Sequence, residues 1–130
     1  MLSGCGSNQA GPTPTGQTRD AGPDTLPLKL NALTADQCFL APAQQGPKTC
    51  EKYVTELGNT AAQVRNRAGA TDQPLTKLAD QLDAAVGAFR SHTCTTVETP
   101  GNGPCTQAIS DIATALQAIK TKVKGQATTG

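Results

Sequence analysis

Three segments of the chain space their apolar residues by three and four positions, as one face of an α-helix does. These segments run from Cys50 to Ala68, from Gln73 to Thr93 and from Cys105 to Lys124. Each is long enough to predict a helix of several turns. The larger apolar residues that carry this spacing are Tyr53, Val54, Leu57, Val64, Leu75, Leu78, Leu82, Val86, Phe89, Ile109, Ile112, Leu116, Ile119 and Val123.

The residues that flank these segments suit helix ends. Gly69 follows the first segment as a stop signal, and Asp72 precedes the second. Lysines in the last turn of the third segment suit the negative end of the helix dipole, and Gly125 suits a left-handed cap. No segment alternates with a period of two for long enough to predict a strand. The sequence therefore predicts an all-α fold, an up-down bundle of three helices.

A leucine-rich segment, residues 26–40, precedes the first long helix. Thr34 and Gln37 match the capping-box pattern, which predicts a short helix over Ala35–Leu40 after an extended or irregular stretch. We expect the groove between two long helices to cover these leucines. The alternative is an exposed segment that binds a partner, although leucine stripes more often belong to a core.

The spacing of four cysteines fits one end of this bundle. An up-down arrangement puts Cys50, Cys94 and Cys105 at the same end, and a short connection brings Cys38 there. Pairing Cys38 with Cys50 and Cys94 with Cys105 closes two loops of similar size, each worth about 3 kcal/mol in the chain-entropy model. The same four positions also permit the other two pairings. We expect the small aliphatic bundle to be stapled by two disulfides.

Metal binding or redox exchange is the alternative role for these cysteines. The intervening stretches contain 11, 43 and 10 residues, so no two cysteines form a CxxC pair. This spacing matches neither a zinc ribbon nor a thioredoxin-like dithiol. We therefore expect structural disulfides, with no metal and no cofactor.

The composition limits the class of protein. The chain has 130 residues with 2% aromatic residues and a formal net charge of +1. A core built from so few aromatic residues is aliphatic, and a charge so close to neutral argues against nucleic acid as a partner. No apolar run is long enough to span a bilayer. The sequence predicts one domain over residues 26–125 and a disordered tail over residues 126–130.

Few side chains are candidates for catalysis. His92 is the only histidine, and it falls near the end of the second helix, where an imidazolium suits the dipole. Asp80 and Asp83 lie three positions apart on one helix face, which is more typical of a solvated surface than of paired catalytic carboxylates. No accompanying nucleophile is recognisable. The sequence therefore predicts that the protein is not an enzyme.

The N-terminal region differs from the rest of the chain. Residues 6–24 contain no large apolar side chain, which predicts a disordered tether. The tetrapeptide Leu2-Ser3-Gly4-Cys5 resembles the lipobox of bacterial lipoproteins. That resemblance implies cleavage before Cys5 and a thioether link from Cys5 to diacylglycerol. Residues 1–4 are then the remnant of a signal sequence, and residues 5–25 are the tether.

The resemblance also implies a location and a broad role. The Ala, Gly, Thr and Pro bias is similar to that of exported lipoproteins of high-GC actinobacteria. We expect attachment to the extracytoplasmic face of the cell membrane through the lipid, where disulfides form. We expect a non-enzymatic accessory or interaction protein of an envelope complex. The alternative is a carrier or sensor that holds a small apolar ligand or a lipid between its helices.

Overall fold

The computed structural model describes residues 25–101 and 103–129, and over these residues the fold is all-α. Three long helices carry the bundle, and shorter helical pieces occupy the N-terminal part and the loops. The helices are α1 (Leu26–Leu33), α2 (Gln37–Leu40), α3 (Glu51–Ala68), α4 (Gln73–Ser91) and α5 (Pro104–Thr129), with single 3-10 turns η1 (Pro42–Gln44), η2 (Pro47–Cys50) and η3 (Cys94–Thr96).

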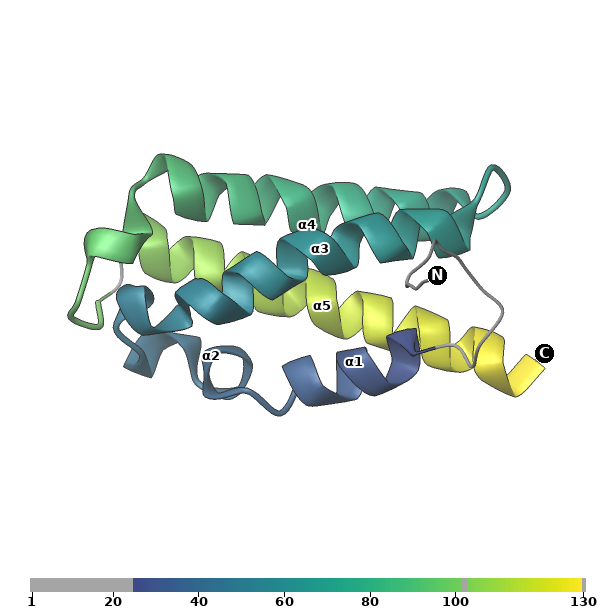
Figure 1. Cartoon of the computed structure of the whole chain (residues 1–130), viewed down its shortest axis with the longest axis horizontal. Helices are drawn as coiled ribbons and strands as arrows, with labels where there is room; N and C mark the ends of the chain where they lie inside the picture. The colour runs from purple at the N-terminus through teal and green to yellow at the C-terminus, as the bar shows by residue number, and fades with distance from the viewer. Residues whose placement is uncertain (1–24, 102, 130) are drawn as a thin grey trace, which may run out of the picture.

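The long helices α3, α4 and α5 lie side by side in alternating directions, which confirms the predicted up-down bundle (Figure 1). Helix α1 packs on α5 and also contacts α3, on the side of the bundle away from α4. The chain thus enters the domain beside the C-terminal half of α5. The connection between α4 and α5 lies at the opposite end.

The core is made almost entirely of aliphatic side chains. Leu57 of α3, Leu82 of α4 and Leu116 of α5 are each 0% exposed, and each lies on its predicted apolar face. Phe89 and Tyr53 are the two buried aromatic residues. Burying a leucine side chain contributes about 1.5–3 kcal/mol, so these stripes supply the main driving force for folding.

The turn between α3 and α4 forms as the sequence predicts. Gly69 has φ of 60°, a conformation that a side chain disfavours, and it ends α3. Asp72 then caps α4, and its carboxylate accepts a hydrogen bond from the backbone amide of Leu75 at 3.1 Å. Gly69 and Asp72 thus mark the two ends of the turn at which the chain reverses direction between α3 and α4.

The predicted extended stretch before residue 35 is wrong, because residues 26–33 form helix α1. Leu26, Leu30 and Leu33 recur at helical spacing and are buried against the bundle. Leu28 breaks this pattern and is 70% exposed. The expectation that helices would cover the leucines is confirmed for the three that share one face of α1.

The predicted capping box of Thr34 and Gln37 is also wrong. Thr34 lies at the C-terminal end of α1, where its hydroxyl donates to the carbonyl of Leu30 at 2.9 Å. The same hydroxyl accepts a hydrogen bond from Lys120 Nζ at 2.9 Å. Asp36 caps the short helix α2 instead, accepting from the backbone amide of Cys38 at 2.8 Å. Thr34 therefore ends α1 and contacts Lys120, a residue 86 positions later in the chain, instead of capping α2.

Helix α5 does not stop at Lys124, because it continues to Thr129. Gly125 therefore does not act as a left-handed cap, and the expected tail over residues 126–130 is helical as far as Thr129. Gln126 explains the continuation, since its amide nitrogen donates to Asp72 Oδ2 at 2.6 Å and its amide oxygen accepts from Arg67 Nε at 2.9 Å. These bonds hold the added turn against the α3–α4 connection.

Two disulfides lie at the end of the bundle where α4 connects to α5. Cys38 is bonded to Cys50 and Cys94 to Cys105, with sulfur–sulfur distances of 2.11 and 2.06 Å. The two expected disulfides are therefore confirmed, and of the three pairings that the sequence leaves open the structure has the one that closes two loops of similar size. All four residues are buried, so the bonds form part of the core as well as closing the loops.

The two disulfide-closed loops also touch each other. The backbone amide of Lys48 donates to the carbonyl of Val97 at 2.8 Å. Gly46 lies so close to the backbone of Glu98 that a Cβ atom there would overlap its carbonyl oxygen. The loop before α3 and the loop before α5 are thus packed through their main chains, which leaves no room for a side chain at position 46.

This contact predicts opposite effects for two glycine substitutions. Gly46→Ala should lower the free energy of unfolding by about 1–3 kcal/mol, as overpacking does. Gly87→Ala is the matched control, because Gly87 lies in α4 with open space around its Cα, and it should raise stability by about 0.5–1 kcal/mol. Urea unfolding measures both. Equal effects of the two substitutions would contradict the close loop contact.

Candidate functional site

The predicted lipidation site lies outside the described residues. Cys5, the signal remnant at residues 1–4 and the tether up to residue 24 all belong to that part of the chain. Their assignments stay predictions. The described part of the chain begins at Thr25, and α1 starts immediately after it.

His92 lies apart from Asp80 and Asp83, and these two carboxylates share one arginine partner. His92 is exposed and caps the C-terminal end of α4. Asp80 and Asp83 both bind Arg65 of α3, Asp80 at 3.0 Å. These carboxylates raise the pKa of Arg65 through hydrogen bonds, Asp80 first. The cluster ties α3 to α4 at the surface, where such pairs add little stability.

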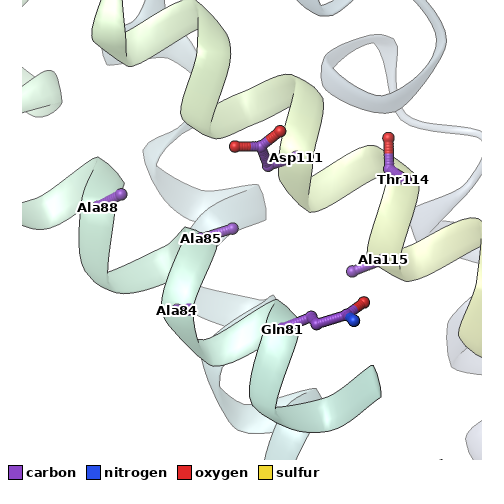
Figure 2. Close-up of a pocket in the computed structure, with 7 residues that line it drawn as sticks. All are labelled: Gln81, Ala84, Ala85, Ala88, Asp111, Thr114 and Ala115. Carbon is purple, nitrogen blue, oxygen red and sulfur yellow. The ribbon is translucent and has the colours of Figure 1, made fainter. Parts of the chain in front are cut away.

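A shallow hollow of about 360 Å³ lies between α4 and α5 (Figure 2). Its floor consists of alanine side chains, and its rim carries polar groups from both helices. Figure 2 shows the lining residues of α4 on one side of the hollow and those of α5 on the other. Because the lining residues are small, this hollow follows from close helix packing, and its shape alone specifies no ligand. The lining residues are Gln81, Ala84, Ala85, Ala88, Asp111, Thr114 and Ala115.

A second hollow, between α1 and α5, combines apolar and basic groups. It measures about 270 Å³ and contains the apolar side chains of Pro27, Leu30 and Val123. Lys120 and Lys124, one helical turn apart on α5, provide its basic side. Of the hollows described here, it is the one lined by two cationic side chains.

The lysines beside this hollow have different partners. Lys120 donates to the hydroxyl of Thr34, a neutral acceptor, so its full positive charge remains at the rim. Lys122 points elsewhere on α5 and lies 4.0 Å from the carboxylate of Asp72. Lys124 is exposed at the edge of the hollow. A negatively charged group would be attracted to Lys120 and Lys124.

Sequence reasoning did not identify this basic hollow. It assigned the lysines of α5 to the helix dipole, and it read residues 26–33 as irregular. The available signal was the position of Leu28, which falls off the helical spacing of the buried leucines. The hollow with its two lysines forms only when α1 packs on α5, so it is not visible in either segment alone.

Tyr53 is the one buried side chain in the described part of the chain whose polar atom has no hydrogen-bond partner. It is 3% exposed. Burial raises the pKa of its hydroxyl above the ordinary value of 10.0, and the negative charge of Asp36 raises this pKa further. The protonated form is therefore the one that the folded domain accepts.

The described residues contain no group of three or more His, Cys, Asp or Glu side chains placed to hold a metal ion. Within the same part of the chain, no helix is both long and apolar enough to cross a membrane. Comparison with known proteins found no matching family model, no matching curated protein and no matching solved structure.

The environment of Tyr53 predicts a specific pH dependence. Because the folded pKa lies above the unfolded one, the protonated hydroxyl contributes its full share of stability below pH 10.0, and this share is lost as the pH rises above that value. Tyr53 is the only tyrosine, so its phenolate absorbance reports on this site alone. We expect no phenolate signal near pH 10.0 while the domain stays folded.

Tyr53→Phe is the matched control for this prediction. It removes an unpaired hydroxyl and keeps the ring, so the variant should be at least as stable at neutral pH. It should also lose less stability than the parent protein as the pH rises above 10.0. Urea unfolding across this pH range measures the difference. A phenolate signal with its midpoint at 10.0 in the folded protein would contradict the burial of the hydroxyl.

Proposed function

We propose that the protein is a lipid-anchored lipoprotein on the extracytoplasmic face of the cell membrane. In this proposal Cys5 carries diacylglycerol, and the helical domain acts without catalysis, as an accessory or interaction protein of an envelope complex. Residues 5–25 link the anchor to the domain.

The pairing of the cysteines carries this proposal. The chain has five cysteines, and Cys38, Cys50, Cys94 and Cys105 are used in two disulfides within the domain. Cys5 is the fifth, and it ends the tetrapeptide that resembles a lipobox. Disulfides form in exported proteins, and lipidation gives the remaining cysteine a role in the same compartment.

The arrangement of polar groups supports a non-enzymatic role. A catalytic site needs several functional groups that converge on one position. Here the imidazole of His92 lies at the disulfide end, while Asp80 and Asp83 are engaged by Arg65.

Transport of a small apolar ligand is the second candidate, and the apolar floor of the α1–α5 hollow favours it. That hollow measures about 270 Å³, which is below the usual range for a pocket that encloses a small molecule, about 300–1,000 Å³. Exposed residues such as Asn31 and Lys124 border it. It therefore suits part of a lipid better than a whole enclosed ligand.

Replacing the anchored residue tests the localisation. Cys5→Ser in the full-length precursor should move the protein from the membrane fraction to the soluble extracytoplasmic fraction, because no acyl chain is attached. Helix content by circular dichroism should stay the same, since the domain begins at α1. The parent protein should stay with the membrane after a high-salt wash. A variant that also stays after this wash would contradict attachment through Cys5.

The interaction role predicts a stable protein complex. Chemical crosslinking in intact cells, followed by purification of the lipidated protein, should yield one crosslinked species containing a second envelope protein. A reduced and unfolded sample provides the control, because binding requires the folded domain. Recovery of the protein by itself with a stoichiometric apolar molecule would instead favour the carrier function.

A further inference from the structure

One surface of the domain combines an exposed leucine with unneutralised lysines. It consists of Leu28 and the residues of the α1–α5 hollow, namely Pro27, Leu30, Asn31, Lys120, Val123 and Lys124, and we call it the basic leucine face. Leu28 does not line the hollow itself, but it lies three positions before Asn31 on α1, so the two side chains are neighbours on the helix surface.

The exposure of Leu28 sets it apart from its neighbours. Leu26 and Leu30 are 4% and 1% exposed, whereas Leu28 is 70% exposed. Its side chain must therefore leave α1 on the side opposite the core. A single exposed leucine is common on protein surfaces, so the leucine alone does not identify a site. The charges beside it are the second observation.

In the described part of the chain, the charged side chains of α1 and of the last turns of α5 are all positive. Helix α1 contains Lys29 and no carboxylate, and α5 contains Lys120, Lys122 and Lys124 after its last carboxylate, Asp111. Asp72 is the carboxylate near this end of α5, and it lies beside Lys122 and Gln126. The lysines at the hollow thus remain available for an external anion.

The position of this face favours a membrane as the partner. Helix α1 starts at the same end of the bundle as the C-terminal end of α5 (Figure 1). Nineteen residues, 6–24, separate Cys5 from Thr25, and a Gly/Ser-like coil of this length has a root-mean-square span of about 25 Å. Residues 6–24 contain no large apolar side chain that could fill the hollow. The face lies close to where the proposed anchor enters the domain.

We propose that the basic leucine face docks on the surface of an anionic lipid membrane. A headgroup phosphate lies between the ammonium groups of Lys120 and Lys124, and Leu28 enters the boundary between headgroups and acyl chains. The hollow accommodates the part of the lipid next to the headgroup. This inference rests on the proposed function, because it assumes that the domain is held beside a membrane.

The docking fixes how the domain is oriented. With α1 and the C-terminal half of α5 against the lipid, α4 faces away from the membrane (Figure 1). The lipid anchor supplies attachment, and the face supplies orientation. Juxtamembrane lysines are attracted by anionic headgroups, and this attraction is screened by salt.

Vesicle binding by the unacylated chain tests this proposal. The full chain with Cys5→Ser is mixed with vesicles rich in phosphatidylglycerol or made of phosphatidylcholine alone, and bound protein is measured by sedimentation. We expect binding to the anionic vesicles that weakens as salt is added, and much weaker binding to phosphatidylcholine. Because this chain has no acyl group, the result is independent of whether Cys5 is lipidated in cells.

Surface variants locate the binding. Lys124→Gln should lower the partition coefficient on anionic vesicles by about fivefold, the usual effect of one lysine near such a surface. Leu28→Gln should lower it on the same vesicles by removing the apolar contact. Lys77→Gln is the matched control, because Lys77 is exposed on α4 at a distance from this face, and it should leave binding unchanged.

Three results would overturn the proposal. These are no binding to anionic vesicles, equal binding to both vesicle types, or an equal loss with Lys124→Gln and Lys77→Gln. Thermal unfolding of each variant confirms that the fold is retained, since all three positions are exposed. If the vesicle results are as expected but Cys5→Ser in cells leaves the salt-washed membrane association unchanged, the anchor fails while the docking face stands.

Discussion

The two disulfides are the constraint on which the rest of the domain depends. One joins α2 to the end of η2, directly before α3, and the other joins η3, which follows α4, to the first turn of α5. Each closes a short loop and removes about 3 kcal/mol of unfolded-state entropy. Small domains have net stabilities of about 5–15 kcal/mol, so two such bonds account for much of the margin. An aliphatic core with two buried aromatic residues benefits from this support.

The disulfides lie at one end of the bundle, and side-chain hydrogen bonds join the helices toward the other end. There Gln126 joins the last part of α5 to Asp72 and Arg67, and Lys120 joins α5 to Thr34 at the end of α1. These polar bonds determine how far α5 extends and where α1 lies against it. The basic leucine face is a consequence of that placement. Helix α5 runs from the disulfide end, through Cys105, to the hollow lined by Lys120 and Lys124, so the same helix serves the fold and the proposed docking.

Much of this fold could be predicted because its causes are local. The three long helices follow from strict spacing of apolar residues, and the gathering of four cysteines follows from which helix ends share one end of the bundle. The choice among the three pairings does not follow from the sequence, because all four cysteines lie at that end. Helix α1 was missed because Leu26, Leu28 and Leu30 alternate along the chain and conceal the helical set that includes Leu33. The role of Thr34 and the extent of α5 depend on partners far away in sequence. The basic hollow depends on the packing of α1 on α5, so no local pattern reveals it.

The central claim is that an oxidised helical domain is joined to a lipid through the one cysteine left over. The intact mass of the protein isolated from its own membrane, measured without reduction, tests this claim most directly. The account predicts a chain beginning at Cys5 that carries at least a diacylglycerol and lacks the four hydrogens lost in forming the two disulfides. A mass equal to the reduced, unacylated chain would contradict both parts of the account.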